Sequence, residues 1–564
     1  MSEEMDVSNG SPPSLEELEQ TDGAKPVTID TTYCDDNIDI LKIMMPYMRW
    51  KQVDPRPPGY PCDIYWHYDT FLDQTGITSG QVNRFPGSRE ICQKINLSRW
   101  LIQMQSLYPE EFNFVPRTYL LPEQFDEFAA EVNKTKGQAD RPTFIVKPSD
   151  GHRGIGVYVM QDMAQFTDEE DDHYVAQEYV SDVFTMNTFK FDLRIHAVIR
   201  SVSPLEFYIC DEGQVRLATM PYTKPTAENI RFANMHLTNF MVNVQNQNYV
   251  LCDEDNVGSQ RLFSAWLKQL GKEGYDTKLL WQNIELLVAK TLIGMTPQML
   301  VDYHAAIPDD QKGPTCFQIV GFDILLRDNL EPVLLEVNHD PSIRVVDTTK
   351  GPSGEMEKGF SVKSFNIRRK LLRDTMLLVT PKGRYSRPRR KPQPHQGDTT
   401  QKVTGPYTPE NVEVEKNEEG EDKSSLIQLV PKLYGKQLQP CRTLERIAEI
   451  FIASVPSTGS AYMSRSAFKD FVKKCEFDKN MSSSEVDELF CTIEQANLHL
   501  NPKGTTGLSF FAFVSACTKM AADEYPRIPF AVQLSSFAEN CERLLGLPGL
   551  KTGTHSNGSS SLDR

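Results

Sequence analysis

The most constraining feature of the sequence is a pair of apolar runs around the polar turn 327–331, a pattern typical of a β-hairpin. With the turn centred between residues 329 and 330, Asp323 faces Glu336, and such pairs have Cβ atoms about 4.5–5.5 Å apart. Asn338 lies two positions beyond Glu336 and projects from the same face. Two close carboxylates repel each other and lose hydration, and a divalent cation removes both costs. The hairpin therefore predicts an Mg²⁺ site at Asp323, Glu336 and Asn338, with a solvated polar face as the alternative.

A strictly alternating segment, 190–196, precedes the hairpin in the chain. Lys190, Asp192, Arg194 and His196 share one face of the predicted strand, and apolar residues share the other. A strand with one solvated face would show the same pattern. The segment is therefore weak support for a site when it is taken alone.

A glycine-rich turn lies further upstream, between the predicted strands 143–147 and 156–160. Its glycines let backbone N–H groups approach phosphates, and Lys147 and Arg153 add positive charge. The pattern G-x-x-x-x-G-K-[ST] is absent, and no helix follows the glycines as in a dinucleotide-binding turn. A tight turn without a ligand is the alternative, but the order of loop, polar strand and acidic hairpin favours a nucleotide site.

The formal net charge of -17 and the sequence pI of about 5.2 disfavour nucleic acid and anionic membranes as partners. The eleven cysteines include no C-x-x-C pair, which is typical of a reduced protein without a zinc ribbon. No run approaches the ~20 apolar residues of a membrane span. We therefore expect a cytoplasmic protein with neither a nucleic-acid nor a membrane partner.

A chain of 564 residues is too long for one core, and changes in composition divide it. Apolar residues at helical spacing near the C-terminus suggest two helix–loop–helix units like an EF-hand pair. The loops 455–464 and 498–508 contain no Asp or Glu, so no Ca²⁺ site is expected. The predicted segments are a disordered N-terminus, 1–26; an α/β or α+β catalytic region, 27–380, with parts at 27–135 and 136–380; a basic-then-acidic linker, 381–425; an all-α helical module, 426–545; and a disordered tail, 546–564.

Eight short motifs occur in an order that resembles the tubulin–tyrosine-ligase-like family, whose catalytic body is an ATP-grasp fold. The resemblance extends over about 63–380. The motifs are Asn83-Arg-Phe-Pro-Gly87 with Ile91 and Lys94; Lys147-Pro with Arg153-Gly-Ile-Gly156; Gln177-Glu-Tyr-Val180; Lys190-Phe-Asp-Leu-Arg194; Arg216-Leu-Ala-Thr219 with Pro221-Tyr222; His236-Leu-Thr-Asn239; Gly321-Phe-Asp323; and Leu335-Glu-Val-Asn338.

The resemblance implies a ligase that uses ATP and Mg²⁺. ATP would phosphorylate a carboxylate of a protein acceptor, expected to be a tubulin tail, and the amine of an amino acid would then attack the acyl phosphate. Catalytic roles are implied for Lys147, Arg194 and Glu336, and metal binding for Asp323, Glu336 and Asn338. The implied ATP contacts are Lys147, Arg153, Gly154, Gln177, Glu178, Tyr179, Val180, Lys190, Phe191, Asp192, Thr238 and Asn239.

The amino-acid half of the site departs from the polyglutamylase-like branch of this family. In that branch H-L-T-N is usually followed by Tyr-Ser and then Asn-Lys, where this chain has Phe240-Met241 and Asn243-Val244. Arg216 is retained and can pair bidentately with an α-carboxylate. The residues implied to meet the incoming amino acid are Arg216, Phe240, Met241 and Lys363.

Glutamate is the first choice of donor, with glycine or tyrosine as alternatives. An impaired nucleotide-binding scaffold on microtubules, or a ligase acting on a non-tubulin protein, is the alternative function. The expected partners are tubulin or microtubules, through their acidic tails, and a free amino acid. A monomer is expected in the cytoplasm and cytoskeleton, with the cilium or basal body as further locations. The basic cluster 382–391 either holds an acidic tail or is a solvated linker.

Overall fold

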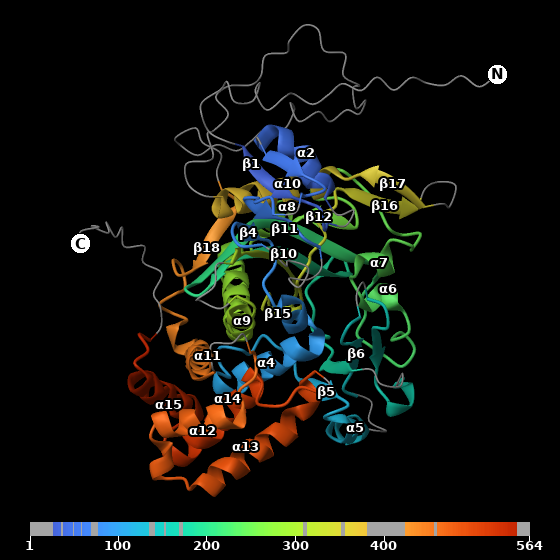
Figure 1. Ribbon diagram of the computed structural model, residues 1–564. Coiled ribbons are helices and arrows are strands. Elements are labelled where there is room, and N and C mark those ends of the chain that lie inside the picture. Colours follow the sequence, from blue (N-terminus) through green and yellow to red (C-terminus); the bar gives the residue numbers. More distant parts are fainter. Residues whose placement is uncertain are drawn as a thin grey trace, which may run out of the picture.

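A seven-stranded antiparallel sheet runs through the middle of the structure, which is a computed structural model (Figure 1). Its strand order is β12-β11-β10-β14-β15, with β18 pairing with β11 and β9 with β10. The strands are β9 (Thr185–Met186), β10 (Phe189–Val202), β11 (Leu205–Pro221), β12 (Gln260–Leu262), β14 (Gln318–Leu326), β15 (Pro332–Asn338) and β18 (Leu426–Val430). The structure describes residues 26–34, 38–48, 50–57, 59–68, 77–134, 141–151, 154–167, 173–307, 313–350, 356–380, 424–455, 460–502 and 504–549.

The central strand β10 is buried on both faces. Phe191, Leu193 and Ile195 point into the largest hydrophobic core, where the helices pack against the sheet. On the opposite face, Asp192 is 2% exposed and His196 is 3% exposed. The polar face predicted from the alternation therefore lies inside the protein, and the alternative of a solvated strand face is wrong.

A parallel sheet in the order β13-β4-β3-β1-β2 lies with α2 and α10 over the other face of the central sheet (Figure 1). Only Phe317 separates β13 from β14, so the chain passes directly from one sheet to the other. The N-terminal sheet thus takes one strand from outside the predicted part 27–135. Its elements are β1 (Val27–Asp30), α2 (Asp39–Met48), β2 (Trp50–Val53), β3 (Ile64–Tyr65), β4 (Gln81–Val82), β13 (Thr315–Cys316) and α10 (Val362–Val379).

A smaller antiparallel sheet, in the order β5-β8-β6-β7, packs with α5 around a separate apolar cluster. The segment 88–107 forms two helices rather than one, because the backbone of Gln93 is extended (ψ 137°). The remaining elements of the body are α3 (Ser88–Cys92), α4 (Lys94–Leu107), β5 (Thr118–Leu121), α5 (Phe125–Lys134), β6 (Phe144–Pro148), β7 (Tyr158–Met160), β8 (Tyr174–Glu178), α6 (Ala233–His236), α7 (Phe240–Asn243), α8 (Phe263–Lys272), β16 (Val346–Lys350) and β17 (Met356–Phe360).

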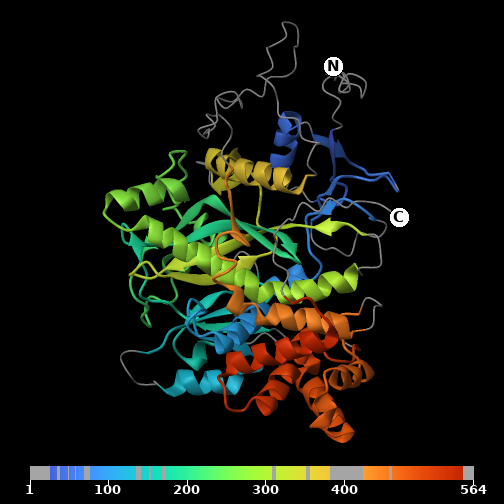
Figure 2. The same cartoon turned by 90° about the vertical axis from the view of Figure 1, so that its left-hand side faces the viewer.

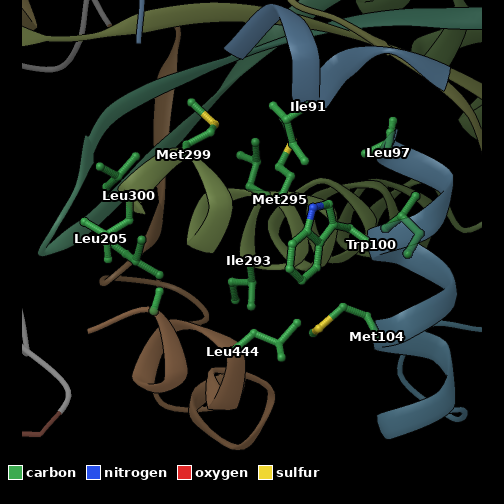
Figure 3. Close-up of a cluster of buried hydrophobic side chains, with 14 of the residues drawn as sticks. Ile91, Leu97, Trp100, Met104, Leu205, Ile293, Met295, Met299, Leu300 and Leu444 are labelled. Atoms are coloured by element: carbon green, nitrogen blue, oxygen red, sulfur yellow. The ribbon is translucent and has the colours of Figure 1, made fainter. Parts of the chain in front are cut away.

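The long helix α9 (Thr277–Ala306) crosses beneath the central sheet and is the one described helix long and apolar enough to span a membrane. The expectation that no segment approaches that length is therefore wrong. The most apolar window of α9 is 83% buried inside the protein. Ile293, Met295 and Leu300 pack among side chains of α4 and the central sheet (Figure 3). Its apolar character is that of a core helix covered on every side.

The chain returns to the central sheet after residue 423 and then forms a helical module. Strand β18 pairs with β11, matching Val430 to Phe207 and Leu426 to Cys210. The segment 426–430, predicted to begin the helical module, is therefore a strand of the body. The module's helices are α11 (Thr443–Ser454), α12 (Arg465–Lys474), α13 (Ser483–Asn497), α14 (Phe510–Glu524) and α15 (Phe530–Leu545). The expected mixed α/β body with a C-terminal helical module is confirmed.

The helical module packs against α9 and α4 through one continuous hydrophobic core (Figure 2). The ring of Trp100, on α4, stacks on Phe510 with centroids 5.3 Å apart, and Phe511 meets it edge-on. The Tyr108 hydroxyl donates to Thr443 Oγ1 at 2.7 Å. Two loops of the module pair through Met463 and Leu508, as expected for two helix–loop–helix units.

Substitution of Trp100 by alanine should therefore destabilise the whole protein. The side chain is 4% exposed, and truncation of a buried aromatic residue typically costs about 3–5 kcal/mol of unfolding free energy. Urea denaturation followed by far-UV circular dichroism measures this change. Val532→Ala is the control, because Val532 is 48% exposed and should change stability by only about 0.5 kcal/mol. Retention of wild-type stability by Trp100→Ala would contradict a shared core.

Candidate active site

The predicted acidic hairpin consists of β14 and β15. Asp323 is paired with Glu336 and Gly321 with Asn338, so the predicted pair is confirmed. The register then shifts by one, because Ile324 is paired with Leu334. Leu335 is thus the extra residue of a β-bulge, and the turn is centred on residue 329 rather than between 329 and 330.

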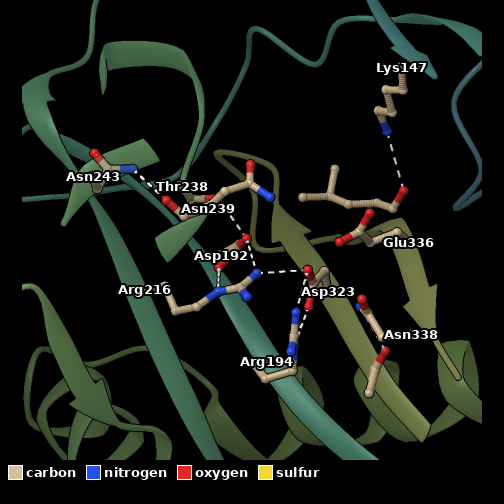
Figure 4. Close-up of polar contacts among 12 residues, drawn as sticks. Lys147, Asp192, Arg194, Arg216, Thr238, Asn239, Asn243, Asp323, Glu336 and Asn338 are labelled. Atoms are coloured by element: carbon tan, nitrogen blue, oxygen red, sulfur yellow. Dashed lines mark hydrogen bonds and ion pairs between the residues drawn. The ribbon is translucent and has the colours of Figure 1, made fainter. Parts of the chain in front are cut away.

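Asp323 is held by two arginines (Figure 4). Arg194 binds it with two nitrogens, one of them Nη2 at 2.9 Å from Oδ2, and Arg216 Nη2 lies 2.8 Å from the same Oδ2. Burial by itself would raise the pKa of Asp323, but the two guanidinium charges hold that pKa below its usual range. Asp323 is therefore a permanent carboxylate.

Arg216 joins this pair to a second carboxylate. Its Nε and Nη2 donate to Asp192 Oδ1 and Oδ2 at 2.7 and 2.6 Å. The Thr238 hydroxyl also donates to Asp192, at 2.6 Å. The four charges Asp192, Arg216, Asp323 and Arg194 form an alternating chain across β11, β10 and β14, which we call the charge ladder (Figure 4).

Glu336 lies beside the charge ladder and has a different charge balance. Within the described part of the chain, it forms one ion pair, with Lys94, whose Nζ lies 3.8 Å from Oε2. Burial and then the charge of Asp323 raise the pKa of Glu336 above its usual range. A divalent cation would remove this repulsion, so the residues fit Mg²⁺. Among the described residues no three His, Cys, Asp or Glu side chains gather around a metal position; the amide of Asn338 and substrate oxygens would complete the ligands.

Two buried lysines line the other side. Lys147 Nζ donates to Gln177 Oε1 at 2.9 Å and to the carbonyl of Leu335, the bulge residue, at 3.3 Å. Burial lowers the pKa of Lys147 to about 8. Burial also lowers the pKa of Lys190 to about 7, although Asp192 opposes that shift. Neither ammonium group forms an ion pair with a carboxylate of the described residues, so both are suited to an anionic ligand.

Lys190 also belongs to a hydrogen-bond relay that fixes a histidine tautomer. Its Nζ donates to the Tyr179 hydroxyl at 2.9 Å and lies 4.2 Å above that ring. The hydroxyl therefore donates to His236 Nδ1, 3.0 Å away, and His236 Nε2 carries the proton toward the Asn229 carbonyl at 3.1 Å. Burial lowers the pKa of His236 to about 4, which agrees with a neutral ring.

These side chains surround a cleft with about 740 Å³ of empty space, between the small sheet and the central sheet. Twelve of the predicted residues line it: Lys147, Gly154, Gln177, Glu178, Tyr179, Val180, Lys190, Asp192, Thr238, Asn239, Asp323 and Glu336. A Cβ on Gly154 would stand 3.2 Å from the Asn239 side chain, and its φ is +78°, so the loop requires glycine there. Lys94, His236 and Leu335 also line the cleft but are absent from the predicted site. All three residues lie in the sequence motifs, but no sequence signal marks the bulge at Leu335.

Other predicted site residues do not reach the cleft. Phe191 lies in the hydrophobic core, and Phe240 packs on Tyr249. Met241 is 40% exposed on α7. Lys363 donates to the carbonyls of Val257 and Gln260 at 2.7 and 2.8 Å. The contact of these side chains with a nucleotide or an amino acid stays a prediction.

Three further predicted residues stand apart. Arg194 and Arg216 touch the cleft only through Asp323 and Asp192. Asn338 donates to the Gly321 carbonyl at 3.4 Å. Arg153 lies outside the described residues, as do the predicted linker up to 423 and most of both predicted disordered ends.

Comparison with known proteins identifies the class to which this fold and site belong. Residues 74–350 match the model of the tubulin-tyrosine ligase family, and 427–556 match the model described as the EF-hand of tubulin polyglutamylase TTLL11. Tubulin polyglutamylase TTLL11 of Homo sapiens is 36% identical over 532 residues, covering 93% of this chain and 74% of the relative. The Mus musculus protein of the same name is 35% identical, covering 92% and 76%. Tubulin polyglutamylase ttll-11 of Caenorhabditis elegans is 32% identical, covering 82% and 65%.

The chain belongs to the tubulin-tyrosine ligase family. The resemblance inferred from the eight motifs is confirmed, and with it the class of the enzyme, a ligase. The match of the C-terminal region to an EF-hand model also confirms the prediction that the helical module resembles an EF-hand pair.

The lowered pKa of Lys190 makes the stability of the ligand-free protein depend on pH. Between pH 7 and the unfolded value near 10.4, the unfolded chain binds the proton that folded Lys190 lacks, so the unfolding free energy should rise with pH. The slope contributed by one lysine is at most about 1.4 kcal/mol per pH unit. Lys190→Met should flatten this dependence in urea titrations from pH 7 to 10, whereas exposed Lys224→Met should keep it. Equal slopes for all three proteins would show that Lys190 keeps its proton when folded.

Proposed function

We propose that this chain is an ATP- and Mg²⁺-dependent ligase that adds glutamate to carboxylates in tubulin tails. The observation that carries the proposal is the carboxylate pair Asp323 and Glu336, facing Lys147 across a cleft of nucleotide size. The relatives that cover most of the chain are named tubulin polyglutamylases, which supports glutamate as donor and tubulin as acceptor.

ATP would lie between the small sheet and the central sheet, as in an ATP-grasp enzyme. Gln177, Glu178, Tyr179 and Val180 form the edge suited to an adenine ring, because they combine backbone groups with apolar side chains. Lys147 and Lys190 would neutralise phosphate oxygens, and the backbone of the loop at Gly154 can approach them closely. Thr238 and Asn239 line the same wall.

Mg²⁺ would be held by Asp323, Glu336 and Asn338 together with phosphate oxygens, and would supply positive charge to the transferring phosphoryl group. The charge ladder keeps Asp323 ionised and fixed in position. A cation bound at Glu336 would oppose the two effects that raise the pKa of this carboxyl group, burial and the charge of Asp323.

The chain's own contribution to catalysis would be charge neutralisation and positioning, which dominate phosphoryl transfer. Lys147 and Arg194 approach the carboxylate pair from opposite sides, through Leu335 and Asp323. An acceptor carboxylate entering between them would be phosphorylated, and the amine of glutamate would displace the phosphate with formation of an amide bond. The side chain of Arg194 is 17% exposed, so it can also meet a substrate.

A second candidate function is a nucleotide-binding scaffold on microtubules that has lost transfer. It is favoured by one observation: the charged groups of Arg216 and Lys363 already form hydrogen bonds within the protein, Arg216 to Asp192 and Lys363 to two backbone carbonyls. Neither is free for the α-carboxylate of an amino acid unless its partners move. Either activity would place the protein, as a monomer, on the cytoplasmic cytoskeleton, including cilia or basal bodies.

Incorporation of radiolabelled amino acids into microtubules with Mg-ATP tests the proposal. We expect glutamate to be incorporated, with glycine and tyrosine run in parallel. Glu336→Gln should lower the rate by about 100-fold or more, because it removes a charge from the metal site. Glu331→Gln, at the exposed turn of the same hairpin, is the matched control and should keep wild-type activity.

No incorporation of any amino acid, together with normal ATP binding, would support the scaffold. Full activity of Glu336→Gln would overturn the assignment of the metal site.

A further inference from the structure

A second cavity, with about 410 Å³ of empty space, lies where the N-terminal sheet meets β14. Phe317, the residue between β13 and β14, forms part of its wall. The backbone there is fixed on both sides, since Phe317 N–H donates to the Val82 carbonyl at 2.9 Å and Phe85 N–H to Gln318 Oε1 at 3.0 Å. The cavity is therefore held between two sheets that are rigidly joined.

His67 lines this cavity, and the nitrogens of its ring form no hydrogen bond. The residue is 1% exposed, and neither ring nitrogen has a hydrogen-bond partner. Its Nε2 is 3.6 Å from Asp30 Oδ2, beyond hydrogen-bond distance. Asn83 clamps the backbone of His67 at both ends, by accepting from its N–H at 2.8 Å and donating to its carbonyl at 3.2 Å. Buried polar atoms without partners are rare in native proteins, and here the backbone is fixed and the residue lines the cavity.

Arg84 supplies positive charge to the same cavity. It is 4% exposed, and it donates to the carbonyls of Tyr68 and Asn83 at 3.0 Å each. Its Nη2 binds Asp340, whose side chain is 19% exposed. Asp340 can therefore turn toward water, and an incoming carboxylate can take its place on the guanidinium.

The cavity adjoins the acidic hairpin. Ile319, Gly321 and Asp323 share one face of β14, so the cavity wall at Ile319 is about 13 Å from Asp323. Pro341 lines the cavity, and its Cβ and the Cδ of Arg194 both lie within 3.4 Å of the position of a Cβ on Gly321. An extended chain of about four residues spans that distance.

We propose that the cavity beside His67 and Arg84 is a subsite for the acidic acceptor peptide, binding a glutamate side chain several residues from the carboxylate that is modified. The inference rests on the proposed function for the identity of the acceptor. A glutamate of the peptide replaces Asp340 on Arg84, and His67 forms a hydrogen bond to that carboxylate or to the adjacent peptide group. The spacing between the cavity and Asp323 then determines which glutamate of a tail is modified.

Fluorescence anisotropy with a labelled glutamate-rich peptide tests the subsite on the full chain without requiring ligation. His67→Phe and Arg84→Gln should each weaken peptide binding by about tenfold, the loss of one charge-assisted contact. Asp340→Asn should tighten binding, because it removes the competing carboxylate. His67→Phe removes only the 3.6 Å contact with Asp30, which Arg56 also binds, so it keeps the test valid if Arg84→Gln does not fold.

Arg56→Gln is the matched control. Arg56 binds Asp30 at 2.8 Å in the same sheet but does not line the cavity, so peptide affinity should be unchanged. Nucleotide affinity should be unchanged in all four variants. Wild-type peptide affinity in His67→Phe and Asp340→Asn would overturn the proposal, as would displacement of the peptide by free glutamate at concentrations near the peptide's own Kd.

The two proposals fail differently. Normal peptide binding that depends on His67, without any incorporation, would remove the ligase function and leave the subsite. Incorporation that proceeds with peptide binding independent of His67 and Asp340 would keep the ligase and remove the subsite.

Discussion

The charge ladder of Asp192, Arg216, Asp323 and Arg194 is the interaction on which the rest of the site depends. All four side chains are buried or nearly so, and a buried ion left without its partner costs about 3–5 kcal/mol. Asp192 is in register with Arg216, and Arg194 with Asp323. A slip of one residue would place an apolar side chain opposite each charge. The charge ladder and the strand register therefore specify each other. The charge ladder has two positive and two negative charges, so it adds no net charge to the site.

The helical module is coupled to the site through α4. This helix begins at Lys94, which lies 3.8 Å from Glu336, and six residues later Trp100 stacks on Phe510 of the module. Six residues of helix span about 9 Å. The same rigid element thus carries a charge into the cleft and an aromatic anchor into the module's core. With β18 paired to the central sheet, the module is held at two places and fixes the helix that borders the active site.

The sequence predicted the parts of the site that depend on local pattern. The pairing of Asp323 with Glu336 follows from a hairpin, although the predicted turn is wrong by half a residue and the bulge at Leu335 compensates for it. Arg216 illustrates the limit of such reasoning. Its motif suggests that Arg216 binds the incoming amino acid. In the structure it binds the carboxylates of Asp192 and Asp323, which lie on other strands, and no local pattern encodes that register. Strand β18 was missed for the same reason, since its partner lies more than two hundred residues earlier.

The two carboxylates of the hairpin are chemically unequal, and this inequality explains why the site needs a substrate to complete it. Asp323 already has two guanidinium partners, so a cation gains little by approaching it first. Glu336 has a more distant ammonium, that of Lys94, and a repelling neighbour, Asp323, so a bound cation improves the electrostatic energy of Glu336 more than that of Asp323. Cation binding at Glu336 brings excess positive charge next to Lys147, which is favourable only when phosphate oxygens enter with the metal. The arrangement therefore favours a cation bound to a nucleotide over a cation alone, and couples the two binding events through the carboxyl group of Glu336.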